Sequence, residues 1–306
     1  MKEQMKSKSW SLAKNLSSIK TKTSSQYSLK DFTRLLDLKN PKLKKIEALL
    51  SGQFTSKQKG EGFDFNEIRE YKIGDDLRHI SWNTTAKTGN LHTKEYNSEK
   101  EIRTYFLIDI SNSMFCGSKT NSFTQLFAFL LNISCGFSEK TGGLFFSNDI
   151  KYTFPFGNSY SQSNVIFQNF LKLTENLKTK ITTTSSKTNI SKALEFAEKY
   201  FRKKGVIFLI SDFIGFERWE KSIYQTSLKQ NIYSFQIHDL LDYELPKTGC
   251  IEIIDPETHE RCFVNTDSNT IRTAYNNKMF KKQDELNAFL KKIGIHHTII
   301  EKFDFE

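Results

Sequence analysis

Residues 105–113 read YFLIDISNS, and this stretch decides the fold class of the chain. Its first four residues form a continuous apolar run, which is typical of a strand buried on both faces of a sheet. A second run of this kind covers Val206–Ile210. Further strands are expected at 144–146, 152–156, 232–237 and 297–301, and helices at 121–140, 161–177, 189–203, 217–229 and 268–292. This alternation predicts an α/β fold, in which a parallel sheet carries helices on both faces.

The chain as a whole is expected to have three regions. A basic, partly helical and partly disordered N-terminal arm is predicted for residues 1–51. Residues 52–100 are punctuated by glycine and contain two short extended runs, which predict a small β-rich element. Residues 101–306 form the α/β domain, and a hairpin is expected within it at 251–254 and 262–264.

The positive charge of the chain is concentrated at one end. The net charge is +10, yet residues 1–60 alone carry 14 Lys and Arg against 4 Asp and Glu, so the remaining residues are neutral overall. A nucleic-acid-binding domain is expected to carry a basic face on its folded part. The pattern therefore favours a solubilising arm, and nucleic-acid binding through that arm is kept as an alternative.

Cysteine content and hydropathy indicate the cellular compartment in which the protein is expected. The 4 cysteines are scattered and include no CxxC pair, which argues against a disulfide scaffold and a zinc knuckle. The N-terminal residues lack the apolar segment of a signal peptide. The most apolar helical stretch, Leu126–Phe137, falls short of the ~20 residues that cross a bilayer. We therefore expect a cytoplasmic protein without a transmembrane segment.

Polar residues follow the predicted buried strands. Asp109, Ser111 and Ser113 come after the first strand, and Asp212 comes after the second. Thr188 stands at the start of a predicted helix. Ligands of open α/β sheets bind at the carboxyl ends of the strands, so these side chains are expected to converge. Their oxygens are the donors that Mg²⁺, Mn²⁺ or Ca²⁺ prefer, although each residue taken singly could also be a helix cap or a turn residue.

The Asp-x-Ser-x-Ser pattern, followed by a Thr and a strand-end Asp, resembles the metal-ion-dependent adhesion site of von Willebrand factor A domains. The resemblance implies a three-layer, Rossmann-like von Willebrand A-type sheet. It also implies that Ser111 and Ser113 bind the cation directly, with Asp109, Thr188 and Asp212 completing the set. One coordination position would stay open for a carboxylate from a partner protein.

An upstream segment narrows the resemblance. The stretch Glu61–Trp82, EGFDFNEIREYKIGDDLRHISW, is similar to the signature of the bacterial domain-of-unknown-function 58 family, and LHTKEY at Leu91–Tyr96 continues it. Members are typically paired with MoxR-type AAA+ ATPases, which are thought to act as chaperones on client proteins. Many members carry N-terminal membrane helices, and this sequence shows none. The resemblance implies an adaptor or co-chaperone that works with such an ATPase.

The sequence thus predicts a metal-dependent protein-interaction module and not an enzyme. A metal-dependent phosphohydrolase is the alternative that uses the same oxygens, but it needs a general base or a second metal that the sequence does not reveal. Neither a Walker A loop, a GxSxG elbow nor an HExxH motif is present. Within the upstream segment, we expect Tyr71 and Trp82 to be packing residues. Ion pairs are expected among Arg69, Asp75, Asp76 and Arg78, locking the segment to the sheet.

Overall fold

The computed structural model describes residues 29, 44, 46–48, 50, 59–97, 102–179, 188–200, 204–214, 219–255 and 260–301. The chain divides into two compact units, one formed by residues 38–102 and the other by residues 1–37 and 103–306. Most of the predicted N-terminal arm lies outside the described residues. The few described positions in it are helical, and of these Leu29, Ile46 and Leu50 are buried.

The larger unit contains a six-stranded sheet in the order β10-β7-β6-β3-β4-β5. The strands are β3 (Arg103–Asp109), β4 (Lys140–Phe146), β5 (Ile150–Asn158), β6 (Val206–Ser211), β7 (Asn231–Ile237) and β10 (His296–Ile300). All neighbours are parallel except β4 and β5, which pair antiparallel at the edge of the sheet. The short connection 147–149 explains the exception, because a parallel pair needs a long crossover.

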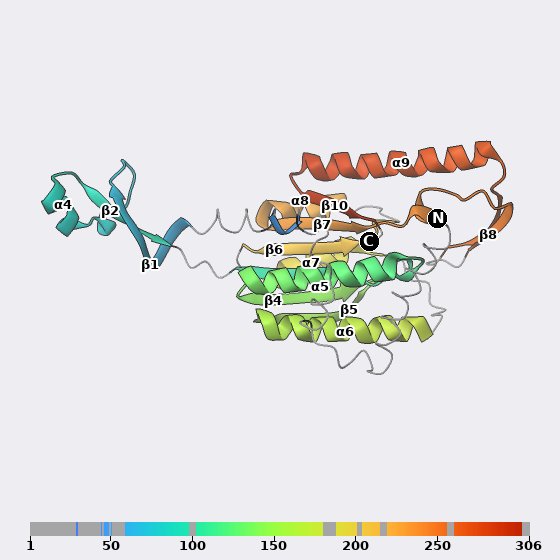
Figure 1. Cartoon of the computed structure of the whole chain (residues 1–306), viewed down its shortest axis with the longest axis horizontal. Helices are drawn as coiled ribbons and strands as arrows, with labels where there is room; N and C mark the ends of the chain where they lie inside the picture. Colours follow the sequence, from blue (N-terminus) through green and yellow to red (C-terminus); the bar gives the residue numbers. More distant parts are fainter. Residues whose placement is uncertain are drawn as a thin grey trace, which may run out of the picture. The chain divides into compact units, whose positions relative to one another are not determined.

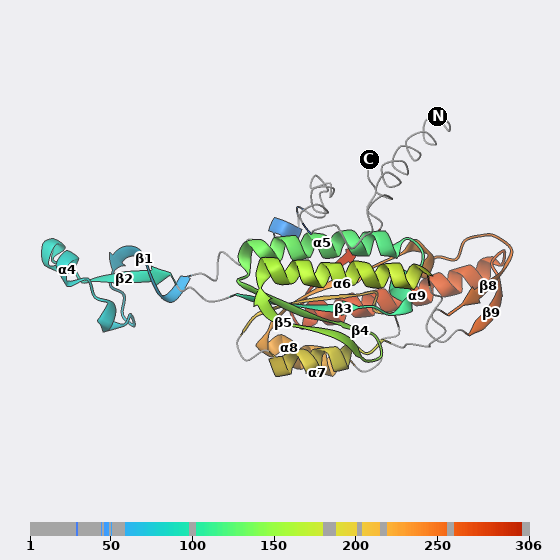
Figure 2. The same cartoon turned by 90° about the horizontal axis from the view of Figure 1, so that it is seen from below.

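Helices cover both faces of this sheet, as Figure 2 shows. On one face lie α5 (Lys119–Phe137) and α6 (Ser159–Thr179). On the other face pack α7 (Ile190–Tyr200), α8 (Glu220–Lys229) and α9 (Asn269–Lys292). The predicted three-layer α/β fold is confirmed, and each predicted helix and strand of this unit is present with small shifts at its ends.

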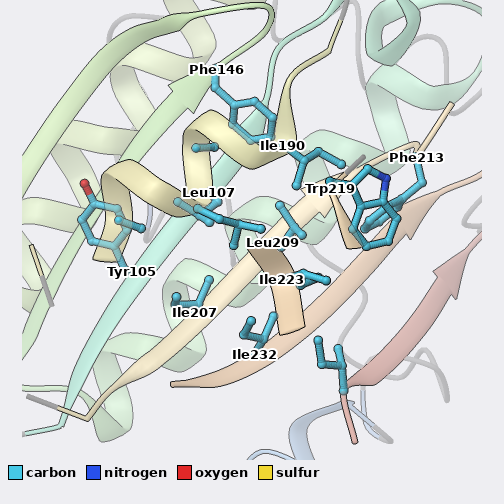
Figure 3. Close-up of a cluster of buried hydrophobic side chains, with 14 of the residues drawn as sticks. Tyr105, Leu107, Phe146, Ile190, Ile207, Leu209, Phe213, Trp219, Ile223 and Ile232 are labelled. Atoms are coloured by element: carbon cyan, nitrogen blue, oxygen red, sulfur yellow. The ribbon is translucent and has the colours of Figure 1, made fainter. Parts of the chain in front are cut away.

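The two faces of the sheet bury different side chains. The α5–α6 face is aromatic, with Phe127 within 6.4 Å, centroid to centroid, of several other phenylalanine rings. The other face buries mainly aliphatic side chains, including Leu107, Ile207 and Leu209, together with Phe213 and Trp219 (Figure 3). Alternate residues of β3 and β6 supply the two faces, so the continuous apolar runs are the physical cause of the three layers.

Two insertions follow the carboxyl end of β7, and α9 then leads back to β10 (Figure 1). The first is a 3₁₀ turn, η5 (Leu240–Asp242). The second is the predicted hairpin, formed by β8 (Cys250–Ile254) and β9 (Arg261–Asn265). The turn η5 places polar and apolar residues next to the strand ends that carry the candidate site.

The smaller unit contains β1 (Lys59–Glu70) paired antiparallel with β2 (His92–Asn97). Between them lie η3 (Leu77–His79) and a short helix, α4 (Trp82–Thr88), which the sequence analysis did not predict. The helix ends at Gly89, whose φ of 79° is the left-handed conformation that glycine supplies at helix ends.

Four charged residues, here called the turn cluster, shape the loop between β1 and η3: Arg69, Asp75, Asp76 and Arg78. Arg69 Nη1 and Nη2 both donate to the Asp75 carboxylate, at 2.8 and 2.9 Å. The Asp76 carboxylate accepts from the Arg78 guanidinium and caps η3 through the Arg78 N–H at 2.9 Å. The predicted ion pairs are confirmed, and both join residues within this unit.

The prediction that Trp82 is a packing residue is wrong. Its side chain is 68% exposed, at the start of α4, while Tyr71 is half-buried. Leu77 and Ile73 are exposed as well. The smaller unit has too few long elements to cover these apolar side chains within itself, whereas the sequence pattern reports only that they are apolar.

Candidate metal centre

The carboxyl ends of β3 and β6 lie side by side at the centre of the sheet. From here the chain order runs outward in opposite directions, through β4 and β5 on one side and through β7 and β10 on the other. Such a reversal of strand order leaves a crevice outside the strand ends, where α/β proteins bind ligands. Asp109 is the last residue of β3, and Asp212 follows β6 directly. The topology therefore brings the two predicted carboxylates together.

Asp109 organises the loop that follows β3. Its side chain is fully buried; Oδ1 accepts a hydrogen bond from the Ser111 N–H at 2.9 Å, and Oδ2 accepts one from Ser211 Oγ at 2.6 Å. Burial raises the pKa of Asp109 to about 7, and the nearby charge of Asp212 contributes to the rise. A buried carboxylate beside a second carboxylate is electrostatically unfavourable unless a cation offsets them.

The serine hydroxyls of the predicted motif also meet. Ser111 precedes the 3₁₀ turn η4 (Asn112–Phe115), and Ser113 lies within it, so both side chains face the same side. The two Oγ atoms are 3.0 Å apart and buried. Adjacent ligands of an octahedral Mg²⁺ site, each about 2.1 Å from the ion, are separated by about 3.0 Å. The hydroxyl spacing therefore fits two neighbouring positions around such an ion.

Asp212 is held from two directions. Its Oδ1 accepts a hydrogen bond from the Ile214 N–H at 3.1 Å, and its Oδ2 lies 3.2 Å from the Lys119 ammonium. The next residue, Phe213, has a φ of 56°, a left-handed conformation that costs about 1 kcal/mol for a residue with a side chain. Its N–H bonds Ser211 Oγ at 3.1 Å, and its ring packs against Trp219 (Figure 3). These contacts hold the strained turn that positions Asp212.

Lys119 is the first residue of α5 and was not among the predicted site residues. Its side chain is only 2% exposed, and its Nζ lies 3.2 Å from Asp212 Oδ2 and 2.8 Å from Asp242 Oδ2. Burial by itself would lower the pKa of Lys119, but the two carboxylates outweigh it and the pKa is raised. Lys119, Asp212 and Asp242 are here called the edge cluster, and its lysine is charged.

Asp239 forms a second connection between the loop after β3 and the turn after β7. Its Oδ2 accepts hydrogen bonds from the Ser118 N–H at 2.9 Å and from Ser118 Oγ at 2.6 Å. Its Oδ1 caps η5 through the Leu241 N–H at 3.0 Å. The loop after β3 and the turn after β7 are thus joined through Ser118–Asp239 and through Lys119–Asp242.

Thr188 lies at this edge on the β4 side. It precedes Asn189, whose N–H donates to the Ser147 carbonyl oxygen at 2.9 Å, just beyond the end of β4. Asn189 Oδ1 accepts a hydrogen bond from the Lys192 N–H at 3.1 Å, so Asn189 is the residue that caps α7. The structure thus joins Asp109, Ser111, Ser113 and Asp212 through hydrogen bonds and charge, and places Thr188 beside the neighbouring strand end.

The donor set fits a hard divalent cation. Among the described residues, no group of three or more His, Cys, Asp and Glu side chains is arranged to hold a metal ion. A cation at this edge would therefore take hydroxyl oxygens as well as carboxylates, and Ser111, Ser113 and Asp109 provide both within one short loop. This combination suits Mg²⁺ or Mn²⁺ better than Zn²⁺, which is held mainly by imidazole and thiolate.

Three supporting residues escaped the sequence analysis, although signals for them exist. A lysine in the first turn of a helix opposes the helix dipole, so Lys119 needed an acidic partner. Asp239 and Asp242 follow the apolar strand β7, as Asp109 follows β3. Applying the strand-end search to every strand would have found both carboxylates.

Sequence similarity links this chain to a known protein family. One family, described as protein of unknown function DUF58, matches residues 67–285. This chain belongs to that family. An uncharacterized protein of Mycobacterium bovis is 21% identical over 218 residues, which are 70% of this chain and 67% of that protein. An uncharacterized protein of Mycobacterium tuberculosis matches to the same extent.

Solved structures with a similar fold include two bacterial proteins. The conserved hypothetical protein BatB from Bacteroides thetaiotaomicron is 16% identical, with 66% of this chain and 91% of that chain covered and a TM-score of 0.39. A von Willebrand factor type A protein from Catenulispora acidiphila is 14% identical, with 47% of this chain and 34% of that chain covered and a TM-score of 0.33. The three-layer fold with a Rossmann-like, mostly parallel sheet predicted for this DUF58 member is confirmed, because the strand order reverses at β3 and β6.

The sequence predicts no transmembrane segment. Within the described parts of this DUF58 protein, no helix combines the length and the apolar character that crossing a bilayer requires. The described cysteines, Cys116, Cys135, Cys250 and Cys262, are all free.

Proposed function

We propose that this chain is a metal-dependent protein-interaction module and not an enzyme. The observation that carries the proposal is the pair of serine hydroxyls, 3.0 Å apart, beside two buried carboxylates at the point where strand order reverses. Ser111 and Ser113 would bind a Mg²⁺ or Mn²⁺ ion directly, and Asp109, Thr188 and Asp212 would complete its surroundings. The bound ion supplies a positive centre at the strand edge that attracts an anionic ligand.

The partner's ligand would be an aspartate or glutamate carboxylate. A carboxylate completes the oxygen shell of a hard divalent ion, and the bond is strong where the surroundings exclude water. Burial of Asp109, Ser111 and Ser113 supports such a partly dry site. The family resemblance supplies the candidate partner, a MoxR-type AAA+ ATPase or its client protein, with this chain as adaptor or co-chaperone in the cytoplasm.

An apolar rim beside the site supports a protein as the ligand. Leu240 and Leu241 are 66% and 59% exposed in η5, directly before Asp242, which contacts Lys119. The capping box of Asp239 and Asp242 holds this turn in place. A segment with an acidic residue next to an apolar one would bury these leucines while its carboxylate approaches the ion.

The test is co-purification of the MoxR-type ATPase from the same source with the full chain, in Mg²⁺ and in EDTA. We expect binding that requires Mg²⁺ and is lost in the Ser111→Ala, Ser113→Ala double variant. The Leu240→Ser, Leu241→Ser variant should also lose the ATPase, while keeping its stabilisation by Mg²⁺. Binding that is equal in EDTA and in Mg²⁺ would contradict metal dependence, and an ATPase that never co-purifies would contradict this partner.

A further inference from the structure

Lys119 carries its positive charge next to one of the predicted ligands of the metal. Burying an ammonium costs several kcal/mol unless carboxylates surround it, and the start of a helix adds to that cost. Asp212 and Asp242 offset it at 3.2 and 2.8 Å. The ammonium thus takes up part of the negative charge that a divalent ion at this edge would need.

The two carboxylates that hold Lys119 differ in their surroundings. Asp212 is 1% exposed, and its other oxygen accepts the Ile214 N–H. Asp242 is 21% exposed, belongs to η5 and contacts Lys119 over the shorter distance. Lys119 could therefore leave Asp212 and still keep a charged partner, because Asp242 contacts the same ammonium from a separate element, η5.

We propose that Lys119 is a built-in competitor for the divalent cation: its ammonium and the metal ion are alternative partners of the Asp212 carboxylate. This inference rests on the metal site of the proposed function. Without metal, Lys119 bridges Asp212 and Asp242 and stabilises the edge. When the ion binds, the ammonium is held by Asp242 alone and Asp212 faces the metal.

Competition has a consequence for affinity. A positive charge within a few ångströms opposes the approach of a second cation, and the attraction of Asp212 to Lys119 must be given up when the ion binds. The metal alone should thus bind weakly, and a partner carboxylate should raise its affinity by restoring the missing negative charge. Lys119 thus determines how much the partner carboxylate raises the affinity for the metal ion.

The experiment is a calorimetric titration of the full chain with Mg²⁺ and Mn²⁺ alone, for wild type and Lys119→Met. Methionine fills a similar volume without the charge. We expect at least tenfold tighter binding in the variant, together with a lower melting temperature without metal and a larger rise on adding metal. Lys192→Met is the matched control, because Lys192 pairs with Asp149 at 2.7 Å while half exposed, and it should leave the affinity unchanged.

The possible results separate this inference from the proposed function. Equal or weaker binding in Lys119→Met, with wild type binding metal, would overturn the competition and leave the metal site standing. Absence of binding in both would overturn both proposals. Binding by Lys119→Met alone would support the competition most strongly.

A measurement on the unaltered protein covers the case in which Lys119→Met does not fold. Amine-specific labelling followed by mass spectrometry reports how accessible each lysine is. Lys119, which is 2% exposed, should be protected without metal and labelled at least severalfold faster at saturating Mn²⁺, while Lys192 should not change. Labelling of Lys119 that does not respond to Mn²⁺ would contradict its release from Asp212.

Discussion

The molecule contains two clusters of acidic and basic side chains that use the same chemistry in different surroundings. The turn cluster of the smaller unit, Arg69 with Asp75 and Arg78 with Asp76, has shorter contacts and a two-pronged pair, but water reaches it. The edge cluster places Lys119 and Asp212 almost entirely out of water. Because solvent screens the turn cluster, its ion pairs contribute little to stability and mainly fix the conformation of the loop. Because the edge cluster is buried, its charges strongly affect both stability and ligand binding.

The largest expected effect concerns the charge at the centre of the edge cluster. Lys119→Met leaves Asp212 and Asp242 without a counter-ion, and breaking a buried ion pair on one side typically costs about 3–5 kcal/mol of unfolding free energy. Urea denaturation without metal measures it. Arg69→Gln, which removes the Arg69–Asp75 pair of the turn cluster, should change the midpoint far less. Equal losses of unfolding free energy in the two variants would show that burial does not make the edge cluster more important for stability than the turn cluster.

A second prediction concerns the stability of the folded chain in mild acid. His297 lies beside the edge, within hydrogen-bond distance of Ser234 and Gln236, and burial lowers its pKa to about 4. Between pH 6.5 and 4 the unfolded chain therefore binds a proton at His297 that the folded chain does not, so the contribution of His297 to stability falls as pH falls through this window. The full contribution of this group is on the order of 3 kcal/mol.

The pH dependence of unfolding measured by urea denaturation checks this prediction. In His297→Gln the slope of stability against pH should lose the contribution of His297 between pH 6.5 and 4. Part of the slope should remain, because burial also lowers the pKa of His238. A slope identical to that of wild type would contradict the burial of a neutral His297.

A third prediction concerns the ion itself. A divalent cation present at 100 times its Kd stabilises the folded chain by about 2.7 kcal/mol, which raises the melting temperature by several degrees. Ser111→Ala with Ser113→Ala should abolish the rise, because the two hydroxyls are the proposed direct ligands. Thermal melts with Mg²⁺ and with EDTA measure it. A rise that persists in the double variant would place the ion elsewhere.

The smallest effect is expected from the turn cluster in acid. The side-chain hydrogen bonds from Arg69 and Arg78 lower the pKa of Asp75 and of Asp76 to about 2. Their contribution to stability is therefore present above the ordinary carboxyl pKa and is lost only as the pH falls from about 4 to 2. NMR titration of the Asp75 carboxyl should show its pKa rising toward 3.8 in Arg69→Gln. An unchanged pKa would mean that the pair does not form in solution.

The two regions also differ in how well their sequences predict them. In the larger unit, the apolar runs ending at Asp109 and before Asp212 predicted the strands, their edge and the residues that meet there. Each signal is local in sequence and reports burial directly. In the smaller unit, composition did not predict that α4 is a helix or that Trp82 is exposed, since both depend on how few neighbours the unit offers.

Lys119 shows the limit of the prediction within the site. Its two partners, Asp212 and Asp242, come from distant parts of the chain, and only the order of the strands brings them to the start of α5. A motif search finds only the residues that belong to a known pattern. It therefore misses Lys119, which lies outside the motif but contacts one of its carboxylates.

Electron paramagnetic resonance of Mn²⁺ directly tests whether the strand edge binds a divalent ion, because free Mn²⁺ gives a signal that bound Mn²⁺ loses. Titrating the full chain should show one bound ion per chain in wild type, tighter binding in Lys119→Met, and no binding when Ser111 and Ser113 are both replaced by alanine. Absence of bound Mn²⁺ in wild type and in Lys119→Met, with both proteins folded, would contradict the metal site and the function built on it.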